Sequence, residues 1–253
     1  MRRLRRHRRI LSTALPLATM LGAAGVASSR TGQSFPDAPH PIAVASTVPA
    51  VLPVVDPTAA LATVLRELAP DLRDEALQPA LRAWEHLRGE GIATRPLLTV
   101  IDYGLPSTTP RLWVFDLDTR RLLYHELVAH GRNTGGDLAT TFSNAEGSLQ
   151  TSLGSFVTGA TYTGRNGYSM RLLGLDAGRN DQALARAIVM HGASYVDPEF
   201  ARKVGRLGRS WGCPAVRPAI AHELIDAIKE GSVVFAWHPS LQSGLEGGGL
   251  AAP

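Results

Sequence analysis

The chain contains a single cysteine, Cys213, among its 253 residues. A lone cysteine cannot close a disulfide within the chain, so this thiol needs another explanation. It stands in the stretch Arg-Ser-Trp-Gly-Cys-Pro (209–214), where a hydroxyl residue, an aromatic residue and a glycine precede it. This composition is typical of a tight loop that exposes a side chain. The alternative is a small buried thiol that packs as a hydrophobic residue.

The first 27 residues have the pattern of an export signal. Six arginines and no acidic residue lie in the first nine positions, an apolar stretch begins at Ile10, and small residues close it at 25–27. This pattern predicts export to the periplasm or cell wall and removal of residues 1–27, leaving no stable membrane span. An uncleaved anchor is the weaker alternative, because the apolar stretch is short and interrupted by polar residues. The pair Arg8-Arg9 leaves both the general and the twin-arginine route open.

Removing this segment changes the charge of the protein. The whole chain carries 26 basic and 22 acidic residues, a formal charge of +4. Residues 1–27 hold six arginines and no acid, which leaves 20 basic and 22 acidic residues, a charge of −2. The excess positive charge therefore belongs to the targeting segment, and we expect no binding of nucleic acid.

The segments before the main domain differ in composition. Residues 28–57 are rich in proline and alanine without an apolar period, which predicts an extended linker. Residues 58–92 predict a pair of helices packed on the main domain, because apolar residues recur at helical spacing. The two stripes are Leu61, Val64, Leu65 and Leu68, and then Leu77, Leu81, Trp84 and Leu87.

Residues 93–238 predict one mainly β domain with a few peripheral helices. The expected strands are 97–101, 111–117, 122–129, 168–173 and 232–237, and a glycine- and hydroxyl-rich region covers 131–169. We expect a short helix capped at Asn180-Asp181 and ending at the buried run 187–190. A second helix should open at Pro218 and close at Gly231. Residues 239–253 are rich in glycine and predict a mobile tail.

Two of the eight histidines are candidates for a catalytic base. His130 and His191 each follow an apolar run and precede a glycine, so both are expected at the end of a strand facing a cleft. The other six lie in the export signal, the linker, the helices, a strand or the tail. Spacing alone does not choose between the two candidates. A lone histidine is more often a hydrogen-bonded structural residue than a catalyst.

Several blocks in the same order resemble the murein L,D-transpeptidase catalytic domain family, a branch of the YkuD-type L,D-transpeptidases. The first blocks are His-Gly-Arg-Asn-Thr-Gly (130–135), Phe-Ser-Asn (142–144), Ser-Leu-Gly-Ser-Phe (152–156), Gly-Arg-Asn-Gly-Tyr-Ser (164–169) and Gly-Leu-Asp (174–176). The strongest are Ala-Ile-Val-Met-His-Gly-Ala (187–193) and Gly-Arg-Leu-Gly-Arg-Ser-Trp-Gly-Cys-Pro-Ala-Val (205–216). The resemblance implies a YkuD-like β-sandwich. The chain departs from the broader YkuD pattern at Trp211 and at Pro214-Ala215, where that pattern often has polar residues.

The resemblance implies a role for each residue of the motif. Cys213 corresponds to the nucleophile and His191 to the base, with the Gly192 carbonyl orienting the imidazole. A thiol needs such a base, because a free cysteine with a pKa of about 8.5 is only a few per cent thiolate at neutral pH. Gly212, Trp211 and Ser210 form the loop, where the N–H groups of residues 212 and 213 are expected to form an oxyanion hole.

The resemblance also implies the substrate, peptidoglycan stem peptides. Cys213 would expel the terminal D-alanine of a tetrapeptide, form a thioester and transfer it to a neighbouring stem as a 3-3 cross-link, with no metal or organic cofactor. Carbapenems would acylate the same thiol. The rim residues expected to bind substrate are His130, Arg132, Asn133, Arg165, Tyr168 and Arg209. The alternatives are an L,D-carboxypeptidase or other wall peptide hydrolase using the same site, and a non-catalytic wall-binding module. No oligomeric state follows from the sequence.

Overall fold

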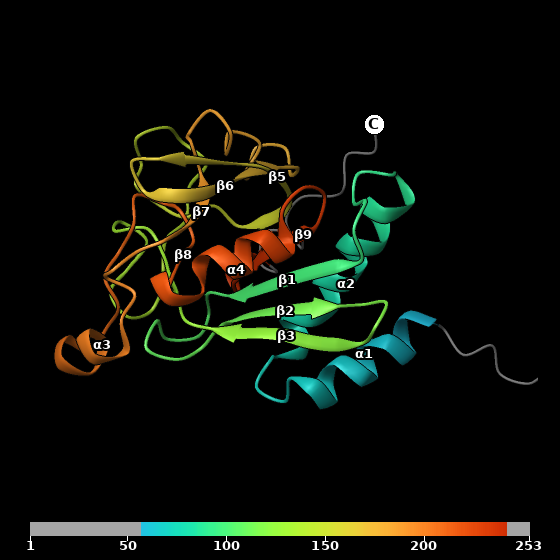
Figure 1. Ribbon diagram of the computed structural model, residues 1–253. Helices are drawn as coiled ribbons and strands as arrows, with labels where there is room; N and C mark the ends of the chain where they lie inside the picture. Colours follow the sequence, from blue (N-terminus) through green and yellow to red (C-terminus); the bar gives the residue numbers. More distant parts are fainter. Residues whose placement is uncertain (1–56, 242–253) are drawn as a thin grey trace, which may run out of the picture. The chain divides into compact units, whose positions relative to one another are not determined.

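The computed structural model describes residues 57–241 (Figure 1). The predicted export signal and the linker up to residue 56 lie outside these residues, as do residues 242–253 of the predicted tail. Residues 239–241 of that tail are described, and Leu241 is buried against the core. The helices are α1 (Pro57–Leu68), α2 (Asp74–Gly89), α3 (Pro198–Val204) and α4 (Pro218–Ile228). The strands are β1 (Leu97–Asp102), β2 (Leu112–Asp116), β3 (Arg121–Glu126), β4 (Val128–Ala129), β5 (Gly154–Gly164), β6 (Gly167–Gly174), β7 (Val189–Gly192), β8 (Ala215–Val216) and β9 (Val233–Trp237).

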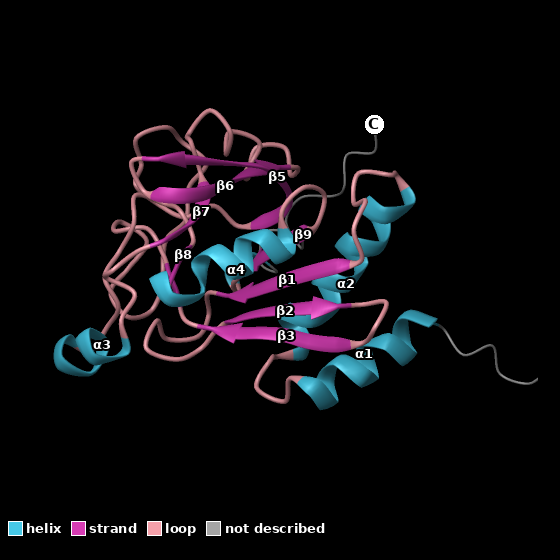
Figure 2. Cartoon of the chain, in the orientation of Figure 1, coloured by secondary structure: helices cyan, strands magenta, loops and turns pink. Residues whose placement is uncertain are grey.

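All nine strands belong to one sheet, in the order β3-β2-β1-β9-β5-β6-β7-β8-β4. The two outermost strands, β3 and β4, are consecutive in the chain and separated only by Leu127. The sheet therefore curls until its two edges nearly meet. Figure 2 shows the helices lying around these strands, with α3 at the periphery. This arrangement confirms the predicted fold class, mainly β with peripheral helices.

The strands β1, β2 and β9 are predominantly apolar because they are largely buried on both faces. Every residue of β1 and β9 is buried, and β9 pairs with β1 in parallel and with β5 in antiparallel orientation. Helix α2 packs on β1 and β9, and helix α1 packs on α2 and β3. The predicted helical stripes supply these contacts, since Leu65, Leu77 and Leu81 are completely buried.

An ion pair fixes the helical pair to the sheet. Arg73, which immediately precedes α2, donates from Nε to Oδ2 of Asp102 at 2.7 Å, and its Nη2 donates to Oδ1. The Asp102 side chain has no exposed surface and also accepts from the Gly104 N–H at 2.9 Å. A buried carboxylate is stable only when it is paired in this way.

Helix α4 covers the other part of the sheet, where β6 and β7 lie. It begins at Pro218, whose fixed φ suits the first turn, and buries Ala221, Leu224, Ile225 and Ile228. The predicted helix at this place is confirmed. By covering β7, α4 gives the strand that carries His191 a rigid support.

Three sequence predictions were wrong in detail. Strand β5 crosses the glycine- and hydroxyl-rich region in which no strand was predicted; threonine has high β-propensity, and one threonine of the strand buries its hydroxyl in hydrogen bonds. This residue, Thr158, donates to the Ile228 carbonyl at 2.8 Å. No helix follows Asn180: residues 176–187 form turns, and the Asn180 side chain donates to the carbonyls of Leu153 and Ser155. The predicted strand 122–129 is split into β3 and β4 at Leu127.

The structure also contains α3, a helix that was not predicted. Within residues 57–241, no helix combines the length and the apolar character needed to cross a membrane.

The buried pair between Arg73 and Asp102 predicts a stability difference. Asp102→Ala should lower the free energy of unfolding by about 3 kcal/mol, because it leaves the guanidinium of Arg73 without its carboxylate. The matched control is Asp74→Ala, which removes an Arg66–Asp74 pair whose aspartate side chain is 55% exposed, and should cost about 1 kcal/mol or less. Urea unfolding followed by circular dichroism measures both, and equal losses would contradict the assignment.

Candidate active site

The candidate nucleophile and base lie on neighbouring segments because β7 and β8 pair in parallel. The register sets His191 opposite Ala215 and Gly192 opposite Val216. Cys213 immediately precedes Pro214 and β8, so it lies alongside the start of β7. Paired strands are about 5 Å apart. Two residues that are distant in sequence are therefore held in one region of the sheet.

The loop before Cys213 requires glycine at position 212. Gly212 has a φ of 124°, which side chains rarely adopt, and a Cβ there would lie 2.7 Å from the Gln150 carbonyl oxygen. Ser210 closes the loop: its hydroxyl donates to the Cys213 carbonyl at 2.6 Å and accepts from the Gly212 N–H at 3.1 Å. Ser210 is therefore a brace of the nucleophile loop, and the Gly212 N–H is engaged within it.

The sulfur of Cys213 is almost buried, with 8% of the residue exposed. It accepts from the Val189 N–H at 3.5 Å and donates to the Ala187 carbonyl at 3.8 Å. Burial raises the pKa of the thiol, and the Val189 N–H and the charge of Arg186 act in the opposite direction. Because the charged form is disfavoured by burial, the resting sulfur is a neutral thiol.

The His191 imidazole is oriented by its own strand. Its Nδ1 lies 3.0 Å from the Gly192 carbonyl oxygen, an acceptor that fixes the proton on Nδ1 and leaves a lone pair on Nε2. The residue is 5% exposed. Burial lowers the pKa of His191, and the Gly192 carbonyl raises it in part. A neutral imidazole with a free Nε2 lone pair is the form that can accept a proton.

The thiol and the imidazole are neighbours without a direct contact in this resting arrangement. Among the described residues, the hydrogen bonds of the Cys213 sulfur go to Val189 and Ala187 and none goes to His191. Proton transfer between them therefore needs a rotation of the Cys213 side chain away from the Ala187 carbonyl.

The other candidate histidine, His130, has a different environment. It is 1% exposed, and its Nδ1 accepts from Nη2 of Arg111 at 2.7 Å. Arg111 is itself buried and also donates to the carbonyls of Val128 and Leu105. Burial, followed by the charge of Arg111, lowers the pKa of His130 to about 4. This burial is at odds with the prediction that His130 binds substrate, because the ring offers no surface to a ligand.

Arg132, Asn133 and Arg209 lie around the nucleophile loop. The Arg132 N–H donates to the Ser210 carbonyl at 2.8 Å, and Arg209 Nη1 donates to the Arg132 and Gly135 carbonyls at 3.1 and 2.8 Å. Asn133 Nδ2 donates to the Ser148 carbonyl at 2.9 Å. Burial lowers the pKa of Arg209, and the positive charges of Arg206 and Arg132 lower it further.

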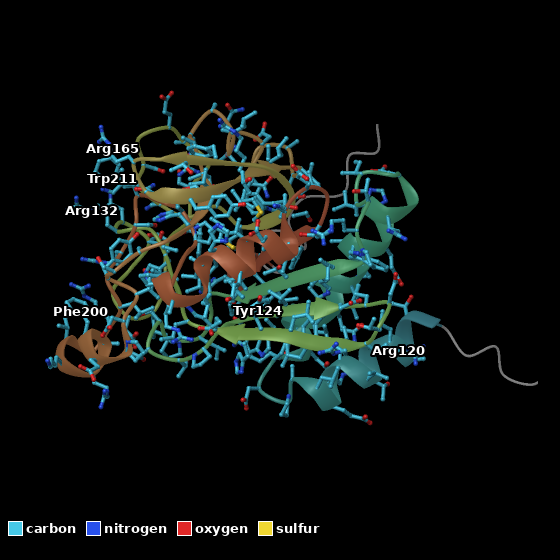
Figure 3. All side chains as sticks on the ribbon, viewed as in Figure 1. Arg120, Tyr124, Arg132, Arg165, Phe200 and Trp211 are labelled. Carbon is cyan, nitrogen blue, oxygen red and sulfur yellow. The ribbon has the colours of Figure 1, made fainter. Side chains whose placement is uncertain are left out.

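Trp211 and Arg132 point outward on the same side of the molecule, as does Arg165 (Figure 3). Trp211 is 67% exposed, which is unusual for so large an apolar side chain. Arg165 lies in the turn between β5 and β6. Tyr168 contacts α4 instead: its hydroxyl donates to Asp226 at 2.7 Å and its ring stacks on His222.

No role was predicted from the sequence for Arg186, which holds the segment 143–152. Arg186 donates to the Ser143 and Gln150 carbonyls and to the hydroxyls of Ser148 and Ser152. Thr151 of the same segment donates to the Gly212 carbonyl at 3.2 Å. Arg186 stands in an alanine-rich run without any motif, so the sequence carried no signal for it. Within residues 57–241, no group of three or more His, Cys, Asp or Glu side chains is arranged to hold a metal ion.

Solved structures with some similarity include an L,D-transpeptidase from Mycobacterium smegmatis, with 16% identity and a TM-score of 0.34 over 56% of this chain and 58% of that chain. The LD transpeptidase LdtMt1 in complex with imipenem has 16% identity and a TM-score of 0.34 over 56% and 59% of the two chains. The helical cell shape determining protein Pgp2 from Campylobacter jejuni has 11% identity and a TM-score of 0.38 over 62% and 56%. The chain thus covers less than two thirds of each.

A search of curated proteins found no match. The family model described as L,D-transpeptidase catalytic domain matches residues 68–237. The match runs from the end of α1 to the end of β9 and includes the nucleophile loop and the strand of His191. With the greater part of its length matched, the chain belongs to the L,D-transpeptidase catalytic domain family.

Proposed function

We propose that this protein is an exported L,D-transpeptidase, a cysteine acyltransferase that joins peptidoglycan stem peptides by 3-3 cross-links. The observation that carries the proposal is the parallel pairing of β7 and β8, which sets Cys213 and His191 on neighbouring segments of the family domain. The orientation of the His191 ring by the Gly192 carbonyl supports the same roles.

The first half of the reaction forms a thioester. The thiol proton of Cys213 passes to Nε2 of His191, and the thiolate attacks the carbonyl carbon of the third, L-centred residue of a tetrapeptide stem. The bond between that carbon and the nitrogen of the terminal D-alanine breaks, and the leaving amine takes the proton from the imidazolium.

The second half resolves the thioester. An amine of a neighbouring stem attacks the thioester carbonyl, giving up a proton to His191, and the sulfur leaves as a thiolate that is protonated again. The negative oxygen formed in each half needs a hydrogen-bond donor. Because Ser210 holds the Gly212 N–H, the Cys213 N–H is the donor of the loop that we assign to this oxygen.

The positive charge around the loop supports a role of its residues in binding substrate. Arg132 and Arg209 lie beside Ser210 and carry positive charge toward the side where Trp211 is exposed. Stem peptides carry carboxylates, which guanidinium groups bind well. The exposed indole offers an apolar surface to the peptide next to them.

Export completes the proposal, because peptidoglycan lies outside the cytoplasmic membrane. The arginine-rich start and the apolar stretch of residues 1–27 have the pattern that directs a chain there. A lone thiol is a liability in an oxidising compartment, and a role as nucleophile accounts for keeping it.

The muropeptide assay tests transfer directly. Incubation of the protein with a purified tetrapeptide muropeptide should give 3-3 linked dimers and free D-alanine, detected by mass spectrometry. Cys213→Ala should lower product formation by about a thousandfold or more, because the attacking sulfur is gone. Tripeptides without dimers would instead identify the hydrolase, an L,D-carboxypeptidase with the same site.

The choice of base predicts unequal effects for the two histidines. His191→Ala should lower turnover by about 100- to 10,000-fold, the usual contribution of a general base. His130→Ala should mainly lower stability, since it removes one of the hydrogen-bond acceptors of the buried Arg111 and leaves a cavity beside it. Steady-state turnover, measured with thermal melting of each variant, separates these effects. Unchanged turnover in folded His191→Ala would overturn the assignment of the base.

A carbapenem distinguishes an enzyme from a wall-binding module. Incubation of the intact protein with imipenem should add the mass of the drug once, because acylation needs an activated nucleophile. The adduct should be absent from Cys213→Ala. An adduct that persists in that variant would place the reactive group elsewhere, and no adduct on the wild-type protein would favour binding without catalysis.

A further inference from the structure

Arg186 directly precedes the residue that contacts the nucleophile. It lies in the turns between β6 and β7, and the next residue, Ala187, accepts the hydrogen bond of the Cys213 sulfur. Ala187 has a φ of 54°, a conformation that non-glycine residues seldom adopt. The hydrogen bond from the Ala187 N–H to the Leu184 carbonyl, at 3.0 Å, holds it there.

The guanidinium of Arg186 lies against the nucleophile loop. Its Nη2 is 3.4 Å from the position that a Cβ on Gly212 would occupy. Because Gly212 is the residue before Cys213, the guanidinium lies next to the part of the loop that carries the sulfur. The side chain is half-buried, so its charge acts across a region from which much of the water is excluded.

The charge of Arg186 is not neutralised within the described part of the chain. Its hydrogen bonds go to two carbonyls and two hydroxyls: Nη1 donates to Ser143 O at 2.7 Å, Nη2 donates to Gln150 O at 2.6 Å and Ser148 Oγ at 3.1 Å, and Nη1 also reaches Ser152 Oγ. None of the ion pairs within residues 57–241 includes it. An arginine keeps its proton in a protein, so a full positive charge stands beside the thiol.

The other titratable groups near the sulfur carry no opposing charge. Tyr103, which follows β1, and Tyr195, which follows β7, both lie near enough to interact electrostatically with an ionised Cys213. Burial raises the pKa of each, that of Tyr195 to about 12, so both rings are neutral at the pH of a working enzyme. His191 is neutral before proton transfer. Arg186 is therefore the charge that acts on the nucleophile.

We propose that Arg186 is a positioning residue that stabilises the Cys213 thiolate through its fixed positive charge. This inference rests on the proposed role of Cys213 as the nucleophile. In the ionisation step the S–H bond breaks and the proton goes to His191, while Arg186 neither gives nor takes a proton. The thiolate forms again when the acceptor amine attacks the thioester, so the same charge also makes the sulfur a better leaving group.

The thiol pKa tests the proposal without any substrate. The chain has one cysteine, so the pH profile of its alkylation by iodoacetamide, followed by intact mass, reports Cys213 alone. Arg186→Gln should raise the thiol pKa by about one unit, which makes alkylation about tenfold slower at a pH below the pKa. Arg186→Lys keeps the charge and should leave the pKa nearly unchanged. Arg179→Gln, on the same turns but paired with Asp176 at 3.8 Å, is the matched control and should have no effect.

A second pair of variants keeps Arg186 and its hydrogen bonds to Ser143, Gln150 and Ser152 in place, in case Arg186→Gln does not fold. Ser148→Asp sets a carboxylate against Nη2 and neutralises the guanidinium, whereas Ser148→Asn has nearly the same shape without charge. The thiol pKa should rise in Ser148→Asp and stay close to the wild-type value in Ser148→Asn.

Three results would overturn the inference. These are an unchanged thiol pKa in folded Arg186→Gln, an equal rise in Arg186→Lys and Arg186→Gln, and equal thiol pKa values in Ser148→Asp and Ser148→Asn. Alkylation does not depend on turnover, so this failure is distinct from failure of the proposed function. A protein that forms no cross-link but shows the expected pKa pattern would retain the electrostatic role of Arg186.

Discussion

The hydrogen-bonded pairing of β7 with β8 is the constraint on which the site depends. It fixes the distance between the strand of His191 and the loop that ends at Cys213. The loop reaches this position only because Gly212 adopts a φ of 124° under the Gln150 carbonyl. Helix α4 supports β7 from one side, and the segment 143–152 covers the loop. The position of the sulfur is thus set by the geometry of the backbone.

Much of the fold could be predicted from the sequence, because buried strands and amphipathic helices leave strong patterns. Strand β9 is a continuous apolar run, β1 is predominantly apolar, and α4 has a proline at its start and one apolar face. Strand β5 could not be recognised, since its glycines disfavour a strand and mask the β-propensity of its threonines. Its place between β9 and β6 is fixed by partners that are distant in sequence. Local pattern does not contain that information.

Of the candidate site, only the residues within the sequence motifs could be predicted. Cys213 and His191 stand in recognisable stretches, but His130 stands in a similar one. The two histidines differ in the hydrogen-bond partner of Nδ1. In His130 this atom accepts from the guanidinium of Arg111, a residue outside the local motif. Arg186 carries no local signal at all, and its importance follows from the fold of the turns that bring it to Gly212. Electrostatics of this kind depends on tertiary distance, which spacing along the chain does not give.

The single residue Leu127 between β3 and β4 joins the two edges of the sheet. Fraying at one edge would therefore be transmitted to the other edge through this single residue. Strand β4 pairs with β8, which begins two residues beyond Cys213. The loop of Cys213 is consequently part of the same hydrogen-bonded sheet as the helix-covered strands. The backbone amide protons of this loop should exchange with solvent as slowly as those of the core, so the site keeps its order up to global unfolding.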